Sequence, residues 1–209
     1  MLRVKICGLT TPQDAAAAIE FGADALGFNF FTGSKRYLRM EAAGEWIASL
    51  PGNVEKVAIL VNPSWEEAKV AAATAGITAL QLHGMETPEF CRRLREARIR
   101  FEKALAVTGP DSLANMPDFF TPSVLLDSGG AAEFGGSGRT FPWEIARDFV
   151  LSHPHLRVIL AGGLTPGNVA EAVALVRPFG VDVTSGVESA PGRKDHARLR
   201  DFIAAARAS

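Results

Sequence analysis

The chain has 209 residues, 47% of them hydrophobic, and a formal net charge of −1. This length allows one large domain or two small ones, with enough apolar side chains for a core that needs no disulfide or metal. The near-neutral charge excludes a global field that would draw the protein to nucleic acid or to an anionic membrane. Any anionic ligand must therefore be bound by local groups.

The cysteine content and the first residues indicate the compartment. Cys7 and Cys91 are too few for a disulfide framework in a chain of this size, which favours a reducing compartment. Residues 1–5 lead into a strand-like pattern without the apolar core of a signal peptide. No uncharged apolar run reaches the ~18 residues that a membrane helix needs. We therefore expect a soluble, cytoplasmic protein that contacts neither membrane nor nucleic acid.

Short strand-like runs alternate with longer helical patterns along the whole chain. Each run is rich in Val, Ile, Leu, Phe or Ala and is followed by Gly, Pro, Ser, Thr or Asn, as is typical of strands that end at turns. The pattern predicts eight strands. They are Arg3–Cys7, Ala25–Phe30, Glu55–Val61, Ala79–Leu82, Arg100–Ala106, Ser123–Asp127, Arg157–Ala161 and Gly180–Thr184.

The segments between these strands carry helix signals. Thr11-Pro12, Thr87-Pro88 and Thr165-Pro166 each place a capping hydroxyl before a proline at the first helical position. Ser64 and Glu67 fit a capping box. Asp111–Met116 is short and weakly helical, so we expect one turn or a loop there. Spacing of i, i+3, i+4, i+7 predicts a buried stripe on three helices. The stripes are Ala43, Trp46, Ile47 and Leu50; Val169, Ala172, Val173 and Val176; and Leu199, Phe202, Ile203 and Ala206.

Strand–helix alternation indicates parallel strands joined by right-handed crossovers. Eight such units in about 200 residues match a compact (β/α)₈ TIM barrel at the small end of its size range. A doubly wound open sheet is the alternative, and it would bind its ligand at one switch point. The unusual residues here follow at least five different strands, which favours the barrel. No linker or low-complexity stretch interrupts the chain, so we expect residues 1–209 to form a single catalytic domain.

Glycines follow the seventh and eighth predicted strands, where a TIM barrel commonly binds phosphate together with a helix N-terminus. Gly162 and Gly163 precede the predicted helix start at Thr165-Pro166, and Ser185 and Gly186 follow the eighth strand. These glycines could instead only form tight turns. Because both loops are glycine-bearing at the two expected positions, the pattern favours phosphate binding.

Four side chains at strand ends or in loops are candidates for chemistry. Cys7 and Asp127 end the first and sixth predicted strands, at the end of a barrel where ligands bind, and so form a candidate base–acid pair. Cys7 could instead be a small buried hydrophobe, and Asp127 could simply accept loop N–H bonds. Arg36 could be a solvated surface charge, and His83 could be a hydrogen-bonded structural residue. Position alone leaves these alternatives open.

Lys5 and Asp182 carry a different signal. Lys5 shares the parity of Cys7 on the first strand, so its side chain should point into the barrel. Asp182 lies within the eighth strand, which neighbours the first in a closed barrel. Because a buried charge needs a partner, we predict that the two side chains pair inside the barrel.

Several of these segments together resemble the phosphoribosylanthranilate isomerase family. The matching motifs occur in the order of the family and span nearly the whole chain. One departure is the loop Thr32-Gly33-Ser34-Lys35-Arg36, where the family typically has P-P-S-x-R, so that the serine and arginine remain without the prolines. The motifs are Lys5-Ile6-Cys7-Gly8-Leu9-Thr10, Leu80-Gln81-Leu82-His83-Gly84, Leu126-Asp127-Ser128, Gly135-Gly136-Ser137-Gly138, Ala161-Gly162-Gly163-Leu164, and Val181–Glu188 with Pro191-Gly192 and Lys194-Asp195.

The resemblance implies an Amadori rearrangement in tryptophan biosynthesis. N-(5′-phosphoribosyl)anthranilate would become 1-(2-carboxyphenylamino)-1-deoxyribulose 5-phosphate. Asp127 would be the general acid that opens the ribose ring, and Cys7, as thiolate, would be the general base at C2′. A thiol with an ordinary pKa of about 8.5 needs a lowered pKa to act as a base at neutral pH. We expect Lys5 or strand-end dipoles to lower it.

The resemblance also implies how the substrate is bound. Arg36 would meet the anthranilate carboxylate bidentately, and His83 would form part of the pocket wall. No metal or organic cofactor is implied, because the iminium ion is itself the electron sink. The four histidines are not spaced as metal ligands with cysteines or carboxylates. The only partner implied is the small sugar phosphate, and the protein could be a monomer or a homodimer. Backbone groups at Gly162, Gly163, Ser185 and Gly186 would hold the phosphate.

Other phosphate-binding barrels are the alternatives. The histidine-pathway aldose–ketose isomerase typically uses aspartates at the ends of strands one and five, whereas strand one here ends in Cys7. Indoleglycerol-phosphate synthase uses lysine and glutamate groups that have no clear counterpart in this chain. A non-catalytic descendant of the enzyme would be expected to lose Cys7 or Asp127, and both are present.

Overall fold

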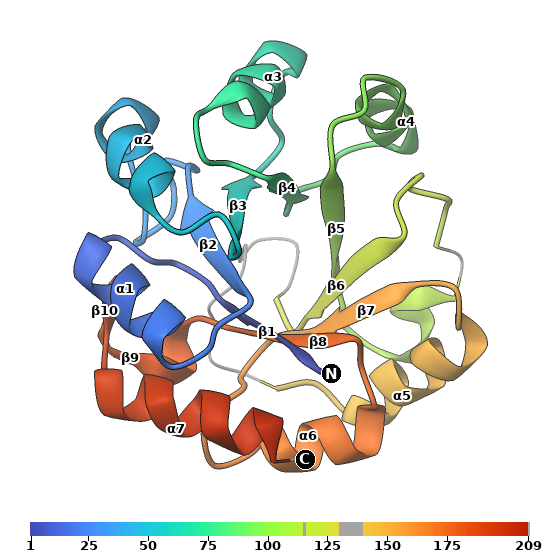
Figure 1. Cartoon of the computed structure of the whole chain (residues 1–209). Coiled ribbons are helices and arrows are strands. Elements are labelled where there is room, and N and C mark those ends of the chain that lie inside the picture. Colours follow the sequence, from blue (N-terminus) through green and yellow to red (C-terminus); the bar gives the residue numbers. More distant parts are fainter. Residues whose placement is uncertain (115, 130–139, 209) are drawn as a thin grey trace.

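A computed structural model of the chain describes residues 1–114, 116–129 and 140–208. Within these ranges eight parallel strands form a closed barrel, in which each strand pairs with the next in sequence and β8 pairs with β1. Helices surround this barrel (Figure 1). The predicted TIM barrel is confirmed, and the open sheet is excluded. The strands are β1 Arg3–Ile6, β2 Ala25–Asn29, β3 Glu55–Leu60, β4 Ala79–Leu82, β5 Phe101–Ala106, β6 Ser123–Asp127, β7 Arg157–Leu160 and β8 Gly180–Val183.

Each predicted strand agrees with the observed one to within a single residue at either end. The expected single turn after β5 is the 3₁₀-helix η1, Pro110–Leu113. The sequence did not predict the elements after β8, a 3₁₀-turn followed by a small antiparallel hairpin: η2 Ser185–Val187, β9 Glu188–Ala190 and β10 Arg193–Lys194. The described α-helices are α1 Pro12–Glu20, α2 Met40–Ser49, α3 Trp65–Ala73, α4 Pro88–Glu96, α5 Trp143–Ser152, α6 Val169–Val176 and α7 His196–Arg207.

Three predicted helix starts are confirmed and one is wrong. The hydroxyls of Thr11 and Thr87 cap α1 and α4, and Ser64 forms a reciprocal capping box with Glu67 at α3. Thr165-Pro166 does not begin a helix. Residues 165–168 form a turn instead, because the Asn168 amide oxygen accepts the N–H of Thr165 at 2.7 Å and α6 begins only at Val169.

The barrel has an apolar outer layer and a mixed interior. The predicted stripes of α6 and α7 are buried between these helices and the barrel wall, and Ala43 and Ile47 of α2 are buried in the same way. The interior holds a small apolar cluster and, besides it, the buried charged side chains Lys5, Glu102 and Asp182. The apolar interior cluster consists of Ala104, Leu125, Ile159 and Ala161.

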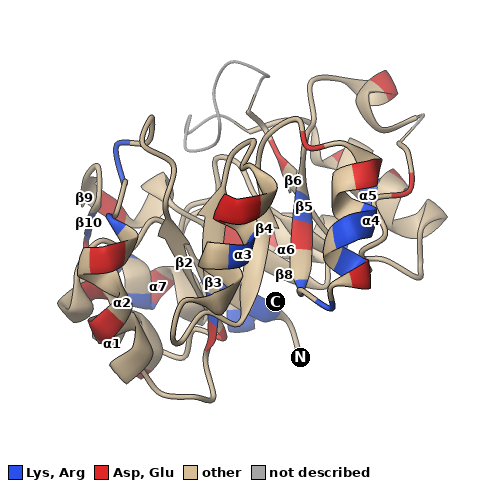
Figure 2. Ribbon diagram, turned by 90° about the horizontal axis from the view of Figure 1, so that it is seen from above, with Lys and Arg blue, Asp and Glu red and all other residues tan. Residues whose placement is uncertain are grey.

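Charges of both signs are spread over the outer helices. Basic and acidic side chains lie on the same helix in α3 and α4 (Figure 2), and Arg92 of α4 pairs with Glu89 and Glu96. Figure 2 also shows charged residues within β5, a strand of the barrel wall. None of the helices in the described ranges is long and apolar enough to cross a membrane.

Candidate active site

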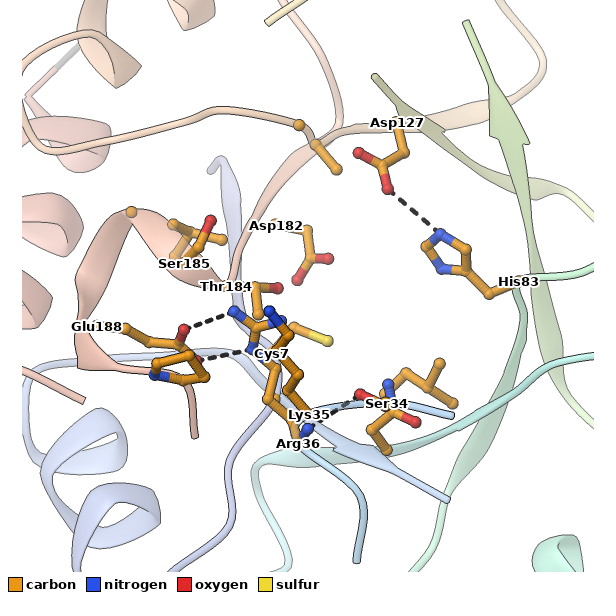
Figure 3. A pocket seen from close by; sticks show the side chains of 18 of the residues that line it. Cys7, Ser34, Lys35, Arg36, His83, Asp127, Asp182, Thr184, Ser185 and Glu188 are labelled. Atoms are coloured by element: carbon orange, nitrogen blue, oxygen red, sulfur yellow. Dashed lines mark hydrogen bonds and ion pairs between the residues drawn. The ribbon is translucent and has the colours of Figure 1, made fainter. Parts of the chain in front are cut away.

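A cavity of about 860 Å³ opens at the C-terminal end of the barrel. The structure brings every sequence-predicted site residue to its wall, although these residues come from the ends of six different strands and their loops. Figure 3 shows His83 and Asp127 on one side of the space, Cys7 and Arg36 on the other, and Asp182 between them. The predicted residues that line the cavity are Cys7, Arg36, His83, Asp127, Gly162, Gly163, Ser185 and Gly186.

Cys7 directly follows β1, and its N–H continues the strand ladder by donating to the Val183 carbonyl at 2.9 Å. The thiol packs against Gly27 of β2, where an added Cβ would lie 2.8 Å from Sγ and 3.0 Å from the Cys7 Cα. Gly27 is therefore a residue that makes room for the thiol. Cys7 is a free, buried cysteine, and so is Cys91 in α4.

The environment of Cys7 acts on its pKa in two directions. Burial and the Asp182 carboxylate raise the pKa of the thiol to about 11, although Lys5 and Lys194 both lower it. We expected Lys5 to help thiolate formation. Lys5 does act in that direction, but in the protein without ligand desolvation outweighs it, so the thiol is protonated at neutral pH.

Asp127 ends β6, and its carboxylate is buried beside His83. The Asp127 Oδ2 atom lies 3.3 Å from Nε2 of His83, which follows β4. On its other side the His83 ring meets the side-chain amide of Gln81, with 2.6 Å between Gln81 Nε2 and His83 Nδ1. His83 is therefore placed between a carboxylate and an amide, which is a more specific position than the pocket wall predicted for it.

Arg36 is held by Glu188, a residue that sequence reasoning missed. The guanidinium donates from Nε to Glu188 Oε1 at 3.0 Å and from Nη2 to Oε2 at 2.6 Å. The buried Lys194 donates to the same Oε1 at 3.2 Å and to the Cys7 carbonyl at 2.6 Å. Glu188 and Lys194 belong to the unpredicted hairpin β9–β10. Both lie in the motif segments after β8, and their place in those motifs was the available signal.

This cluster shifts the pKa values of its members. Hydrogen bonding to Glu188 raises the pKa of Arg36, against the effect of burial. Burial would raise the pKa of Glu188, but Arg36 and Lys194 outweigh it and the pKa is lowered. Burial lowers the pKa of Lys194, although Glu188 opposes the shift. Arg36 and Glu188 are therefore a charged, bidentate pair in the cavity wall.

The two glycine-bearing loops meet at the cavity. Gly162 and Gly163 have φ values of 83° and 63°, a region that other residues rarely adopt. Within the described residues their N–H groups donate to no protein acceptor. In the loop after β8, a Cβ on Gly186 would lie 1.9 Å from the Leu164 carbonyl oxygen. The loops after β7 and β8 thus touch through their backbones, and Gly162 and Gly163 line the cavity beside this contact.

The predicted pair of Lys5 and Asp182 lies inside the barrel, with 3.7 Å between Lys5 Nζ and Asp182 Oδ2. The prediction is confirmed, but Asp182 is not the nearest partner of Lys5. Nζ lies 2.7 Å from Glu102 Oε1 and also donates to Gln81 Oε1. The second carboxylate Glu102 comes from β5, and alternation along that strand was the signal that could have found it.

Two further expectations concern the glycine-rich segment after β6 and the binding of a metal ion. The segment Gly135-Gly136-Ser137-Gly138 lies outside the described residues. In the part of the chain that the structure describes, no group of three or more His, Cys, Asp or Glu side chains is arranged to hold a metal ion.

Comparison with known proteins shows which family this chain resembles. The family model described as N-(5'phosphoribosyl)anthranilate (PRA) isomerase matches residues 4–205. The N-(5'-phosphoribosyl)anthranilate isomerase of Geobacter sp. (strain M21) is 47% identical over 207 residues, which cover 99% of this chain and 98% of that protein.

Solved structures agree with the sequence relatives. A crystal structure of monomers of the dimeric phosphoribosylanthranilate isomerase from Thermotoga maritima superposes with a TM-score of 0.87 at 38% identity. A phosphoribosylanthranilate isomerase in complex with reduced 1-(o-carboxyphenylamino)-1-deoxyribulose 5-phosphate gives the same TM-score of 0.87 and identity of 38%. Both comparisons cover 100% of this chain and 100% of the other.

Proposed function

Because the chain belongs to the N-(5'-phosphoribosyl)anthranilate isomerase family, we propose that it catalyses the cofactor-free Amadori rearrangement of N-(5′-phosphoribosyl)anthranilate in tryptophan biosynthesis. The product is 1-(2-carboxyphenylamino)-1-deoxyribulose 5-phosphate. The observation that carries the proposal is the shared cavity, in which a thiol, a carboxylate and two contacting glycine-bearing loops line one space at the C-terminal end of the barrel. Residues 1–209 act in this proposal as one catalytic domain.

The first chemical step is ring opening. Asp127, as the carboxylic acid, gives its proton to the ribose ring oxygen while the bond from that oxygen to C1′ breaks. The lone pair of the anthranilate nitrogen forms the C1′ iminium ion, which takes up the positive charge. This iminium ion is the electron sink for the next step, so the reaction needs neither a metal nor an organic cofactor.

The second step removes the C2′ proton. The Cys7 thiolate takes this proton, and the C–H electrons neutralise the iminium to give an enolamine. The enolamine then takes a proton at C1′ while its C2′ hydroxyl loses a proton, which gives the ketone. Protons are thus gained at the ring oxygen and C1′ and lost from C2′ and its hydroxyl, so substrate and product have the same composition. The thiol is protonated in the free enzyme, so Cys7 must first release its own proton to solvent. The positive charge of the iminium ion stabilises the thiolate and so lowers the pKa of the thiol once the ring has opened. Cys7 therefore acts as a base after Asp127 has acted as an acid.

The ends of the substrate have different partners. The N–H groups at Gly162 and Gly163 and those at the start of η2, Ser185 and Gly186, bind the phosphate. Arg36 binds the anthranilate carboxylate. Glu188 occupies Nε and Nη2 of its guanidinium, so the Nη1 edge is the one that meets the ligand. His83 lines the wall next to Asp127.

Product analysis tests the reaction itself. We would generate N-(5′-phosphoribosyl)anthranilate in situ, follow the loss of its anthranilate fluorescence with the purified protein, and trap the product ketone with borohydride. The proposal predicts fast conversion that is unchanged after treatment with a chelator. No conversion above the spontaneous rate would contradict the substrate assignment, and loss of activity with the chelator would contradict a cofactor-free reaction.

Compartment and assembly complete the proposal. Two free cysteines fit a reducing compartment, so we place the enzyme in the cytoplasm. It acts as a monomer or a homodimer on a small sugar phosphate, without nucleic acid or membrane. The T. maritima relative is described as dimeric. Sedimentation equilibrium separates the two states, and a larger assembly would contradict both.

A further inference from the structure

A line of polar side chains runs from the barrel interior to the proposed acid. It begins at Lys5 on β1, passes through Gln81 on β4 to His83, and ends at Asp127 on β6. Lys5 and Gln81 are both 1% exposed, so the line is closed to solvent at its inner end. The proposed reaction gives neither residue a role.

Lys5 fixes one end of this line as a donor. Burial lowers the pKa of Lys5, but Asp182 and Glu102 outweigh it and the pKa is raised. The side chain is therefore an ammonium group, which has three donors and no acceptor. One donor meets Glu102 at 2.7 Å, and another meets the side-chain amide of Gln81.

The direction of the amide decides the state of the histidine. Only the oxygen of the Gln81 amide can face an ammonium donor, so its NH₂ group must face the other way, toward His83 Nδ1 at 2.6 Å. A ring nitrogen that accepts from this NH₂ carries no proton. The proton of the neutral ring is then on Nε2, the atom that lies 3.3 Å from Asp127 Oδ2. Figure 3 shows this nitrogen directed at the Asp127 carboxylate.

We propose that Gln81, oriented by Lys5, is a positioning residue that keeps His83 in the neutral Nε2–H form opposite Asp127. This inference rests on the proposed function, in which Asp127 is the general acid. A neutral Nε2–H donor stabilises the carboxylate that remains after Asp127 has given its proton to the ring oxygen. A doubly protonated ring would instead hold Asp127 as a carboxylate from the start, with no proton to give. Gln81 prevents that state, because a proton on Nδ1 would point at the NH₂ group.

Nuclear magnetic resonance of the ¹⁵N-labelled imidazoles reads the tautomer directly. The chain has four histidines, so the His83 ring is assigned by its loss in His83→Asn. We expect the wild type at pH 7.5 to show a protonated Nε2 and an unprotonated Nδ1. In Gln81→Glu a carboxylate oxygen replaces the NH₂ group, and we expect the His83 ring to become doubly protonated at the same pH.

Kinetics separate this role from a structural one. We expect Gln81→Glu to lower kcat at least about 10-fold, toward the loss expected when acid catalysis fails, with KM within about 2-fold. Gln81→Met keeps the shape without the donor, so both neutral tautomers should appear and the fall in kcat should be smaller. Thr78→Val is the matched control, because it removes side-chain bonds of Thr78 with the Lys56 backbone just before β4 and leaves Gln81 in place. It should keep the wild-type tautomer and kcat.

Either of two results overturns the inference. One is an Nδ1–H tautomer or a doubly protonated His83 in the wild type at pH 7.5, which is decided without a variant of Gln81. The other is an unchanged kcat in both Gln81 variants. Failure of the proposed function can be told apart from failure of this inference. A wild-type protein that does not isomerise the substrate still shows which tautomer of His83 it holds.

Discussion

At the scale of single residues, Cys7 is the side chain whose environment most opposes its proposed role. A base must be deprotonated, and burial and Asp182 raise the pKa of this thiol to about 11 in the free enzyme. Because only the thiolate reacts with an alkylating agent, we predict that the rate at which iodoacetamide modifies Cys7 in the free enzyme, followed by mass spectrometry, rises about 10-fold per pH unit from pH 7 toward pH 9. Cys7→Ser should lack this modification. A rate that is flat over this range would contradict a thiol that is protonated in the free enzyme.

Gly27 provides the space that Cys7 occupies. A methyl group at Gly27 would lie 2.8 Å from the sulfur and 3.1 Å from Cδ1 of Ile59. We predict that Gly27→Ala displaces the thiol, lowers kcat by about 10- to 100-fold and costs about 1–3 kcal/mol of unfolding free energy. Gly52→Ala is the control, since no atom lies within 4 Å of its added Cβ. Equal kcat values in the two variants would show that the position of Cys7 does not matter.

At the scale of elements, the contact between the loops after β7 and β8 forms the proposed phosphate site. An added Cβ at Gly186 would lie 1.9 Å from the Leu164 carbonyl oxygen, and backbone cannot yield as a flexible side chain does. Gly186→Ala should therefore push the two loops apart and remove N–H bonds to the phosphate. We predict that KM for the substrate and the inhibition constant of inorganic phosphate both rise about 10-fold or more.

The control for this variant is Gly109→Ala, which meets no atom within 4 Å and has an extended φ of 171°. It should leave both constants at their wild-type values. If Gly186→Ala changes kcat but neither constant for phosphate, the phosphate lies elsewhere in the cavity.

The elements also show where sequence reasoning works. Strand ends were predictable to within one residue, because each apolar run stops at a turn former. The Thr165-Pro166 signal failed because it matches the local pattern of a helix start, while Asn168 closes the turn before α6 by accepting the Thr165 N–H. A helix-capping pattern in the sequence does not say which of two nearby polar residues, Thr165 or Asn168, directly precedes the helix.

At the scale of the whole molecule, a buried charged cluster joins distant parts of the barrel. Lys5 of β1 faces Glu102 of β5 and Asp182 of β8 in the interior. We predict that Lys5→Met lowers the unfolding free energy by about 3–5 kcal/mol, because it leaves two buried carboxylates without their cation. Lys69→Met, which removes a surface pair with Glu66, should change it by less than about 0.5 kcal/mol. Urea unfolding measures both, and equal losses would contradict a stabilising role of the cluster.

The same scale explains what the sequence could not supply. Periodicity predicts eight strands, and closure then places Lys5 beside Asp182, because β1 and β8 are neighbours. Contacts across the barrel, such as Lys5 with Glu102 and Gln81, depend on how the interior side chains pack, which no local pattern records. Glu188 was missed for a related reason. Its pairing with Arg36 joins residues 152 positions apart through a hairpin that the sequence pattern did not predict.

The central claim is that Cys7 and Asp127 carry out base and acid chemistry on phosphoribosylanthranilate. Its most direct test is the initial rate of fluorescence decay with wild type, Cys7→Ser and Asp127→Asn, with Cys91→Ser as the control for loss of a buried thiol. The account predicts a fall of at least about 100-fold in both site variants and wild-type activity in the control. A Cys7→Ser or Asp127→Asn enzyme that works as fast as the wild type would contradict it.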